Sequence, residues 1–192
     1  MPRYDSEWIQ DMLQPERRGS PSEAEIVRAI GILPGDIVAD IGCGPGFLTI
    51  PAAQATGPLG RVDAIDVEHS MLEIVRQRAT AIGLTNIVSH VPSTANVPLA
   101  NESVDVAVCS LLLHDLDDPE AMLQEIARIT RPSGKVAIVE WVPDPLSPRS
   151  NRITAPRLSA MLTSVGLDLG EQIPLPSAQY LIVGIQKPVA RI

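Results

Sequence analysis

The chain has 192 residues, which fits one domain of ordinary size, and 45% of them are hydrophobic, enough to build a core. Its 23 acidic and 15 basic residues give a net charge of −8, with Arg17 and Arg18 as the one adjacent basic pair, which argues against a nucleic-acid partner because that affinity needs clustered Lys and Arg. Two cysteines are too few for a disulfide framework or a four-cysteine metal site, and both are predicted to be small buried residues.

The stretch from Ile41 to Gly60 has no charged residue, which raises the question of a membrane span. Its glycines and prolines instead predict a loop followed by the start of a helix. The first residues, MPRYDSEWIQDML, carry charges where a signal peptide needs an apolar run. We therefore expect no export and no membrane association, and a cytoplasmic location.

Short runs rich in β-branched residues alternate with longer segments of helical period, which is typical of βαβ units around a parallel sheet. Residues Ser20 to Glu23 are interpreted as a capping box with proline at the first helical position. In chain order the pattern predicts a helix over 21–30, a strand over 37–41, a helix from the glycine-rich turn to residue 56, a strand over 61–67, a helix from 70 to about 82, strands over 87–91 and 104–110, a helix opened by Asp118 and Pro119 and running to 129, a strand over 135–141, a helix over 152–165, and strands over 167–173 and 179–186.

The strand over 37–41 runs into three alternate glycines, Gly42, Gly44 and Gly46, before the next helix. Glycine lets backbone approach a ligand closely at the carboxyl end of a sheet. The spacing G-x-G-x-G differs from the dinucleotide fingerprint G-x-G-x-x-G, because Phe47 stands where its third glycine would be, and it lacks the G-K-[ST] of a phosphate loop. The turn therefore argues against NAD and against a nucleotide triphosphate.

Asp66 follows the second strand, twenty-four residues after Gly42. A carboxylate at this place can accept both ribose hydroxyls of an adenosine ligand. A lone Asp here also fits a turn residue or a helix cap. Together with the glycine turn upstream, it predicts an adenosine ligand without a pyrophosphate.

Four motifs follow one another: VADIGCGPG at 38–46, AIDVE at 64–68, SVDVAVCSLLLHDL at 103–116 and ITRPSGKVAIVEW at 129–141. Together they resemble the successive motifs of class I S-adenosylmethionine-dependent methyltransferases, over about residues 26–187, most strongly the branch that acts on small molecules. The resemblance implies an α/β fold: a single-domain, Rossmann-like three-layer sandwich around a seven-stranded, mostly parallel sheet of order 3-2-1-4-5-7-6, with strand 7 antiparallel. It also implies S-adenosylmethionine as cofactor, S-adenosylhomocysteine as product and a small-molecule methyl acceptor.

The resemblance carries functional residues onto this sequence one position at a time. Asp66 matches the acid that binds the ribose diol, and Ser93 stands where many relatives have an acid for the adenine amino group, so we expect Ser93 and the backbone near Thr94 to make that contact. The other matched positions are those of the loop around the methionine part of the cofactor, those near adenine and those facing the catalytic mouth: Asp40, Gly42, Cys43, Gly44, Gly46, Val67, Met71, Ser110 and Leu111.

His114 is the candidate catalytic residue, because it lies four residues beyond Ser110 at the expected ligand edge and could remove a proton from an acceptor. The alternative is that His114 caps a turn or packs near Asp115 and Asp117. His69 and His90 are expected to have structural roles. With two thiols there is no soft-ligand cluster for arsenic or sulfur, and the acids Asp115, Asp117, Asp118 and Asp144 are expected to be a solvated rim rather than a metal site.

Residues 1–20 are predicted to be an arm outside the domain formed by 21–192. Tyr4 and Trp8 of this arm and Trp141 are three of the five aromatic residues. We hypothesise that they surround the acceptor and that the arm, with Arg17 and Arg18, closes over the cofactor as a lid. The acceptor pocket is then built from the arm, the 143–151 loop and the turn after His114.

The leading interpretation is a methyltransferase acting on a small molecule as a monomer or homodimer. The alternative from another class is a protein of the same fold that binds S-adenosylmethionine or S-adenosylhomocysteine without catalysis, because the glycine turn and Asp66 report binding and not turnover. An NAD-linked oxidoreductase is disfavoured by the glycine spacing. The acceptor, and whether O, N, S or C attacks, are not encoded in any motif of the sequence.

Overall fold

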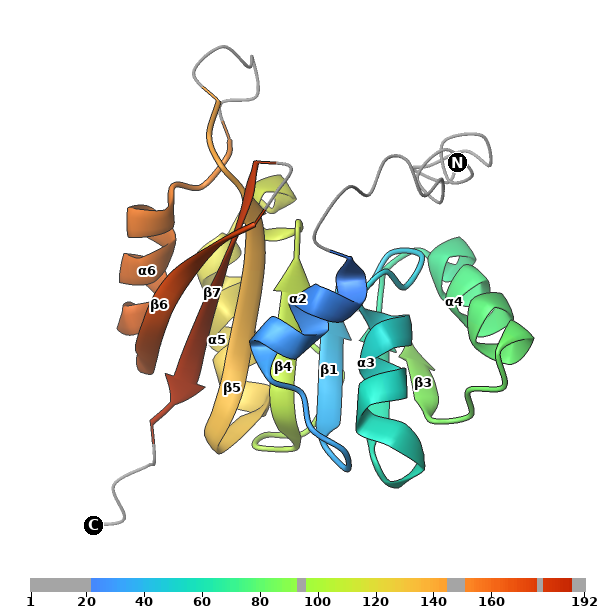
Figure 1. Ribbon diagram of the computed structural model, residues 1–192. Coiled ribbons are helices and arrows are strands. Elements are labelled where there is room, and N and C mark those ends of the chain that lie inside the picture. The colour runs from blue at the N-terminus through green and yellow to red at the C-terminus, as the bar shows by residue number, and fades with distance from the viewer. Residues whose placement is uncertain (1–21, 93–95, 145–150, 176–177, 188–192) are drawn as a thin grey trace. The chain divides into compact units, whose positions relative to one another are not determined.

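The computed structural model describes residues 22–92, 96–144, 151–175 and 178–187 (Figure 1). The contacts between residues group the chain into two compact units, residues 1–93 and 94–192. None of the described helices has both the length and the apolar content that crossing a membrane requires.

The first unit places its strands in the order β3-β2-β1, all parallel. Its helices α2, α3 and α4 pack successively against one another, and α3 and α4 also contact β2 and β3 respectively (Figure 1). Val38, Val62 and Ala64 are fully buried, as expected for strands that are covered on both faces. The elements are α2 (Glu23–Ile30), β1 (Ile37–Ile41), α3 (Thr49–Thr56), η2 (Gly57–Leu59), β2 (Arg61–Ile65), α4 (His69–Ala81) and β3 (Ile87–His90).

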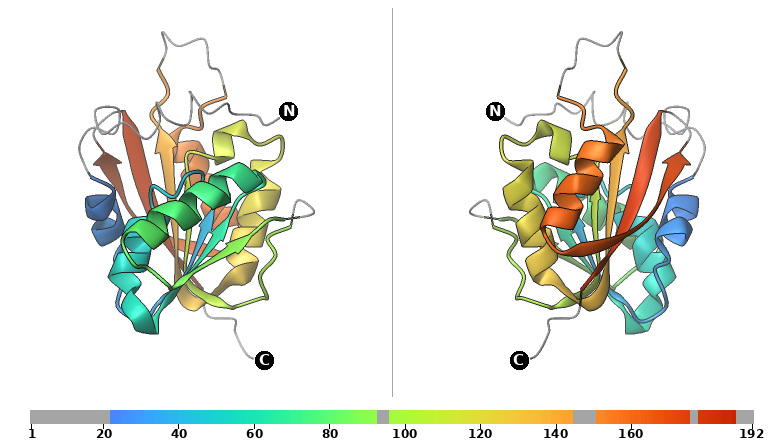
Figure 2. Two further views of the ribbon diagram at one scale, coloured as in Figure 1. Left: turned by 90° about the vertical axis from the view of Figure 1, so that its right-hand side faces the viewer. Right: turned by 90° about the vertical axis from the view of Figure 1, so that its left-hand side faces the viewer.

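The second unit places its strands in the order β4-β5-β7-β6. Strand β4 is parallel to β5, whereas β7 is antiparallel to both β5 and β6. Helices α5 and α6 lie side by side on these strands (Figure 2). The elements are β4 (Val104–Ser110), η3 (Leu113–Asp115), α5 (Pro119–Ile129), β5 (Thr130–Trp141), α6 (Ala155–Ser164), β6 (Leu167–Leu175) and β7 (Gln179–Gln186).

The strand order of the seven-stranded sheet is β3-β2-β1-β4-β5-β7-β6, with β7 as the antiparallel strand. The predicted α/β Rossmann-like fold and its strand order are confirmed. In a parallel pair the carboxyl ends of the strands lie at one edge, which is where α/β folds bind ligands. In each unit, we therefore expect the functional residues to follow the parallel strands.

Two predicted helix starts are wrong by a few residues. The first helix has Ser22 as its N-cap, not Ser20: the Ser22 hydroxyl accepts from the Glu25 N–H, and the Glu25 carboxylate accepts from the Ser22 N–H at 2.7 Å. The sequence S-P-S-E-A-E offers two serines with an acid three residues on, and Ser22 with Glu25 forms the capping box of α2, while Ser20 lies outside the described residues. The last helix begins at Ala155 rather than at 152, because Thr154 caps it.

The fifth strand starts earlier than predicted, at Thr130 instead of Lys135. Val104 pairs with Thr130 and Val106 with Lys135, so the segment between them bulges out of the ladder. Ser133 adopts a positive φ of 65°, and a Cβ on Gly134 would lie 2.8 Å from Thr130 Cγ2. The sequence R-P-S-G predicts a turn, and the turn is present as a bulge inside the strand.

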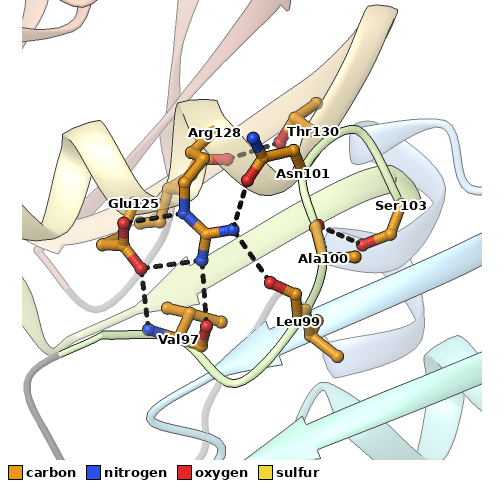
Figure 3. A network of polar contacts seen from close by, with 9 residues as sticks. Val97, Leu99, Ala100, Asn101, Ser103, Glu125, Arg128 and Thr130 are labelled. Atoms are coloured by element: carbon orange, nitrogen blue, oxygen red, sulfur yellow. Dashed lines mark hydrogen bonds and ion pairs between the residues drawn. The ribbon is translucent and has the colours of Figure 1, made fainter.

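Arg128 ties α5 to the segment before β4 in the second unit (Figure 3). Its guanidinium donates to both carboxylate oxygens of Glu125, to the carbonyls of Val97 and Leu99 and to the side chain of Asn101. The side-chain hydrogen bond from Arg128 lowers the pKa of Glu125. This network fixes a loop that has no regular secondary structure, because it supplies donors to carbonyls that the sheet does not pair.

Candidate functional site

The glycine turn of the first unit has three glycines in the left-handed region, with φ of 69° at Gly42, 51° at Gly44 and 83° at Gly46. The backbone N–H groups of Gly42 and Cys43 both donate to the carbonyl of Ile65, at 2.8 and 3.0 Å. The turn is therefore tied to the end of β2 as soon as it leaves β1. Positive φ at alternate positions is easy only for glycine, which explains the G-x-G-x-G spacing.

Asp66 meets the glycine turn because Ile41 and Ile65 are paired, so that β1 and β2 end side by side. Its Oδ2 accepts the Gly44 N–H at 2.8 Å, and its Oδ1 accepts the Glu68 N–H at 2.9 Å. Burial raises the pKa of Asp66, an effect opposed by these two backbone donors. Each carboxylate oxygen has a second lone pair, so Asp66 can hold the turn and still accept hydrogen bonds from a ligand.

The space around the turn fits a ligand beside Gly44. A Cβ built on Gly44 would meet no atom of the described residues within 4 Å, whereas a Cβ on Gly46 would lie 2.9 Å from Val75 Cγ2. Gly46 is thus needed for packing against α4. Gly44 instead leaves its backbone bare on an open side, next to the Asp66 carboxylate, which is what close approach of an adenosyl ligand requires.

Asp40, predicted in the cofactor loop, points into the structure. It is 2% exposed, and its Oδ2 accepts the Thr49 hydroxyl at 2.5 Å. Burial raises the pKa of Asp40 to about 6, even though the Thr49 hydroxyl works against this rise. The carboxyl group of Asp40 therefore links the end of β1 to the start of α3.

Three other predicted residues of this unit lie at different depths. The Cys43 side chain belongs to a buried cluster with Ala64 and Leu72, and burial raises the pKa of its thiol. Met71 is 2% exposed at the start of α4, while Val67 is 69% exposed. The Cys43 side chain thus packs beneath the turn, Met71 is buried in α4, and Val67 offers an open apolar surface just after Asp66.

Arg78 of α4 braces the glycine turn from the side. Its Nη1 donates to the carbonyl of Pro45 at 2.5 Å, and its guanidinium lies over the Phe47 ring, 5.6 Å from the centroid. Sequence reasoning did not identify Arg78, because its partners are more than thirty residues away. The contact restrains the turn at Pro45, which lies between Gly44 and Gly46.

In the second unit, Ser110 and Leu111 are half-buried at the end of β4. Ser110 pairs with Val139, and the Leu111 N–H also donates to the Val139 carbonyl at 2.9 Å. Leu111 has a φ of 54°, which is uncommon for a residue with a side chain. Strained backbone of this kind collects at functional positions, and here it turns the chain sharply from β4 toward η3.

His114 lies in η3 and is buried against Glu140 of β5, which is 0% exposed. The distance from His114 Nδ1 to Glu140 Oε2 is 2.7 Å, and the His114 backbone N–H donates to Glu140 Oε1 at 3.3 Å. Sequence reasoning missed Glu140. The available signal was an acid inside the apolar run VAIVEW, since a buried carboxylate needs a partner.

The segment after β5 makes polar contacts with His114 and with β7. Asn151 Nδ2 donates to the His114 carbonyl at 2.5 Å, and the Tyr180 hydroxyl donates to the Ile153 carbonyl at 2.7 Å. The Arg152 guanidinium lies over Trp141, 5.5 Å from the ring, and its Nε is buried without an acceptor among the described residues. Asn151 thus ties the segment after β5 to His114, and Tyr180 ties the same segment to β7.

His90 has the structural role expected of it. It lies in β3, and its Nε2 is 2.8 Å from Oδ1 of Asp63 on the neighbouring strand. Within the described ranges, no three side chains among His, Cys, Asp and Glu group as a metal ion would need. Ser93, Thr94 and the arm residues Tyr4, Trp8, Arg17 and Arg18 lie outside the described residues, as does the 145–150 part of the predicted acceptor loop.

A family model described as a methyltransferase domain matches residues 39–138, just over half of the chain. This match covers the glycine turn, Asp66 and His114. The chain therefore belongs to the methyltransferase domain family, within the class I S-adenosylmethionine-dependent methyltransferases.

Individual relatives agree on this class. An arsenite methyltransferase from Halobacterium salinarum is 29% identical over 154 residues, covering 73% of this chain and 39% of the relative. A demethylmenaquinone methyltransferase from Lactobacillus johnsonii is 32% identical over 107 residues, covering 55% of this chain and 44% of the relative. A solved S-adenosylmethionine-dependent methyltransferase from Aquifex aeolicus has the same fold, with a TM-score of 0.84, 22% identity and coverage of 95% of this chain and 99% of that chain. The chain spans less than half the length of the two curated relatives.

Proposed function

We propose that this chain transfers a methyl group from S-adenosylmethionine to a small-molecule acceptor. The observation that carries the proposal is the junction of Asp66 with Gly44, where a carboxylate and an open stretch of glycine backbone meet at the ends of β1 and β2. When bound, S-adenosylmethionine supplies a methyl group on a sulfonium sulfur.

The proposal assigns a role to each predicted residue of the cofactor site. Asp66 accepts the ribose hydroxyls, and the backbone at Gly42, Gly44 and Gly46 lets the ligand approach. Asp40 and Cys43 act by shaping the turn from below, since both side chains are buried in the first unit. The remaining assignments are apolar contacts of Val67 and Met71, polar contacts of Ser93 and Thr94 and contacts of Ser110 and Leu111 in the second unit.

The acceptor we favour is organic rather than a metalloid. Of the two relatives above, one is named for arsenite and the other for demethylmenaquinone. Arsenic is a soft element that thiolates hold best, but this chain has only Cys43 and Cys109, both buried. Burial raises the pKa of the Cys43 thiol, which keeps it in the protonated, unreactive form. The chemistry of the chain thus supports an organic acceptor.

The experiment that tests the proposal measures S-adenosylhomocysteine formed by the full chain from S-adenosylmethionine. The acceptor panel contains 1,4-naphthalenediol, catechol, imidazole, dithiothreitol and arsenite. We expect product that depends on an organic acceptor, and Asp66→Ala should lose it while Glu73→Gln, on the exposed face of α4, keeps it. Tight binding of the adenosyl ligand with no acceptor-dependent product would instead identify a binding protein of the same fold.

A further inference from the structure

We infer that Arg152 selects the methyl acceptor by binding a carboxylate group on it, so that the acceptors of this chain are small organic acids. The inference rests on the proposed function and deepens it. The binding site for the carboxylate is formed by Arg152 with Trp141 and Val142, all in the second unit.

Arg152 lies at the edge of the sheet where α/β folds bind ligands. Strand β5 is parallel to β4 and ends at Trp141, and Arg152 Nη1 donates to the carbonyl of the next residue, Val142, at 3.0 Å. The neighbouring Asn151 donates to the carbonyl of His114 in η3, which follows β4. Arg152 is therefore placed beside the carboxyl ends of both parallel strands of this unit.

The Arg152 guanidinium is held by two contacts with the end of β5. Besides its hydrogen bond to Val142, it lies over the Trp141 ring, 5.5 Å from the centroid. Trp141 is itself fixed by pairing with Gln179 on β7. Val142 is 41% exposed, so the site lies at the surface. A guanidinium that is already oriented loses little freedom when it binds a ligand.

The observation that carries the inference is a donor without an acceptor. Arg152 Nε is buried, and among the described residues nothing accepts its hydrogen. An unpaired buried donor is costly, and nearly all buried polar groups in proteins are paired. Because Nη1 is engaged by Val142, the edge of the guanidinium that remains for a ligand is the one formed by Nε and Nη2. A carboxylate accepts from both of these donors through its two oxygens.

The charge of Arg152 also favours an anionic ligand. In the described ranges no Asp or Glu forms an ion pair with Arg152, and in a chain of net charge −8 a cation in this position attracts an anion. Five other arginines each have an Asp or Glu oxygen at 2.5–3.8 Å: Arg61, Arg76, Arg128, Arg131 and Arg157.

A carboxylate fits the site better than a phosphate group. A phosphate monoester carries about −1.5 to −2 charges at pH 7, whereas the three site residues supply one positive charge. A carboxylate carries one negative charge, and its two oxygens match the two donors of one guanidinium edge in shape. The site is therefore expected to distinguish an organic acid from its neutral counterpart.

The first experiment follows the Nε–H signal of Arg152 by NMR in the isotope-labelled full chain. The loss of this signal in Arg152→Lys assigns it. Titration with 3,4-dihydroxybenzoate should shift the signal, because the carboxylate accepts the Nε–H, whereas catechol, which lacks the carboxylate, should leave it in place. A signal that 3,4-dihydroxybenzoate does not move would overturn the inference, since Arg152 would then serve only to hold Trp141.

The second experiment compares acceptors that differ by one carboxylate: catechol with 3,4-dihydroxybenzoate, and 1,4-naphthalenediol with 1,4-dihydroxy-2-naphthoate. In the wild type, kcat/KM should be at least tenfold higher for the acid than for its neutral partner. Arg152→Gln should bring this ratio close to one. Arg152→Lys keeps the charge but loses the two-donor edge, so it should keep part of the ratio. Turnover of the neutral acceptors that equals or exceeds turnover of the acids would refute the inference.

The matched control is Arg157→Gln on α6, which also removes one positive charge, but from an exposed arginine paired with Glu120. It should leave the ratio and the Arg152 signal unchanged, and an equal loss of the ratio in this variant would refute a specific role for Arg152. A chain that binds no S-adenosylhomocysteine would refute the proposed function. A chain that binds S-adenosylhomocysteine but shows an unshifted Arg152 signal would refute this inference alone.

Discussion

Two glycines of one turn, Gly44 and Gly46, differ in what their missing side chains allow. Both have positive φ, but a methyl group on Gly46 would press on the fully buried Val75, whereas a methyl group on Gly44 would meet no atom of the described residues within 4 Å. The same residue type therefore serves packing at one position and ligand approach two positions earlier.

This difference predicts that Gly→Ala acts mainly on stability at Gly46 and mainly on ligand binding at Gly44. Gly46→Ala should lower the free energy of unfolding by about 3 kcal/mol, from the Val75 contact and the left-handed backbone. Gly44→Ala should lower it by about 1 kcal/mol, yet weaken S-adenosylhomocysteine binding at least tenfold because its methyl group fills the ligand's space. Urea unfolding and calorimetric titration of both variants check this. Equal binding by Gly44→Ala and wild type would contradict the assignment of that space to a ligand.

The role of a single residue could be predicted from the sequence where one short motif contains the signal for it. Asp66 was found by its position after the second strand, and its contact with Gly44 agrees with that position. Glu140 was not found, because its partner His114 is 26 residues away and only the parallel pairing of β4 and β5 brings the two together. A motif reports spacing along the chain, whereas this pair depends on strand register.

At the scale of elements, the junction of β1 and α3 depends on one buried pair, Asp40 and Thr49. The Thr49 hydroxyl donates to Asp40, and burial holds the pKa of Asp40 near 6, above the 3.8 of an exposed carboxyl. Between these two values the folded chain keeps a proton that the unfolded chain has lost. Asp40 thus contributes stability that is fully present below about pH 4 and is lost as the pH rises through 6.

Asp40→Asn should remove this pH dependence, since an amide does not ionise and its oxygen still accepts from Thr49. The two pKa values of Asp40 differ by roughly two units, which corresponds to about 3 kcal/mol for one proton. From pH 4 to pH 7 the wild type should therefore lose about 3 kcal/mol of unfolding free energy through Asp40, and Asp40→Asn should not. Urea unfolding at several pH values measures it. Thr49→Val removes the hydrogen bond that lowers the pKa of Asp40, so in this variant the stability should be lost at a higher pH than in the wild type. A difference that does not vary with pH would show that Asp40 ionises as freely as in the unfolded chain.

The elements themselves were predicted well where an apolar run is bounded by glycine or proline. The strands over 37–41, 104–110 and 179–186 have the predicted bounds, and Asp118 caps α5 as expected. The errors lie at termini where two signals compete, as with Ser20 and Ser22, or where a bulge continues a strand past a turn, as at Thr130. Periodicity sets the interior of an element, but local hydrogen bonds decide its ends.

At the scale of the whole molecule, the strand order and the family match both indicate a methyltransferase. Neither of them identifies the methyl acceptor. The alternation of strands and helices predicts a mostly parallel sheet, but the order β3-β2-β1-β4-β5-β7-β6 could be predicted only from the resemblance to methyltransferases. The two relatives described above carry the names of different acceptors. The lid formed by residues 1–20 stays a prediction, since those residues lie outside the described part.

Calorimetric titration of the full chain with S-adenosylhomocysteine, S-adenosylmethionine and NAD tests the central claim most directly. We predict that both adenosyl ligands bind and that NAD does not compete with them. Asp66→Ala should bind the adenosyl ligands at least tenfold more weakly, a loss of about 1.4 kcal/mol or more. The matched variant Glu73→Gln, which removes an exposed acid of α4, should bind as the wild type does. Folded wild-type protein that binds neither adenosyl ligand would contradict the account.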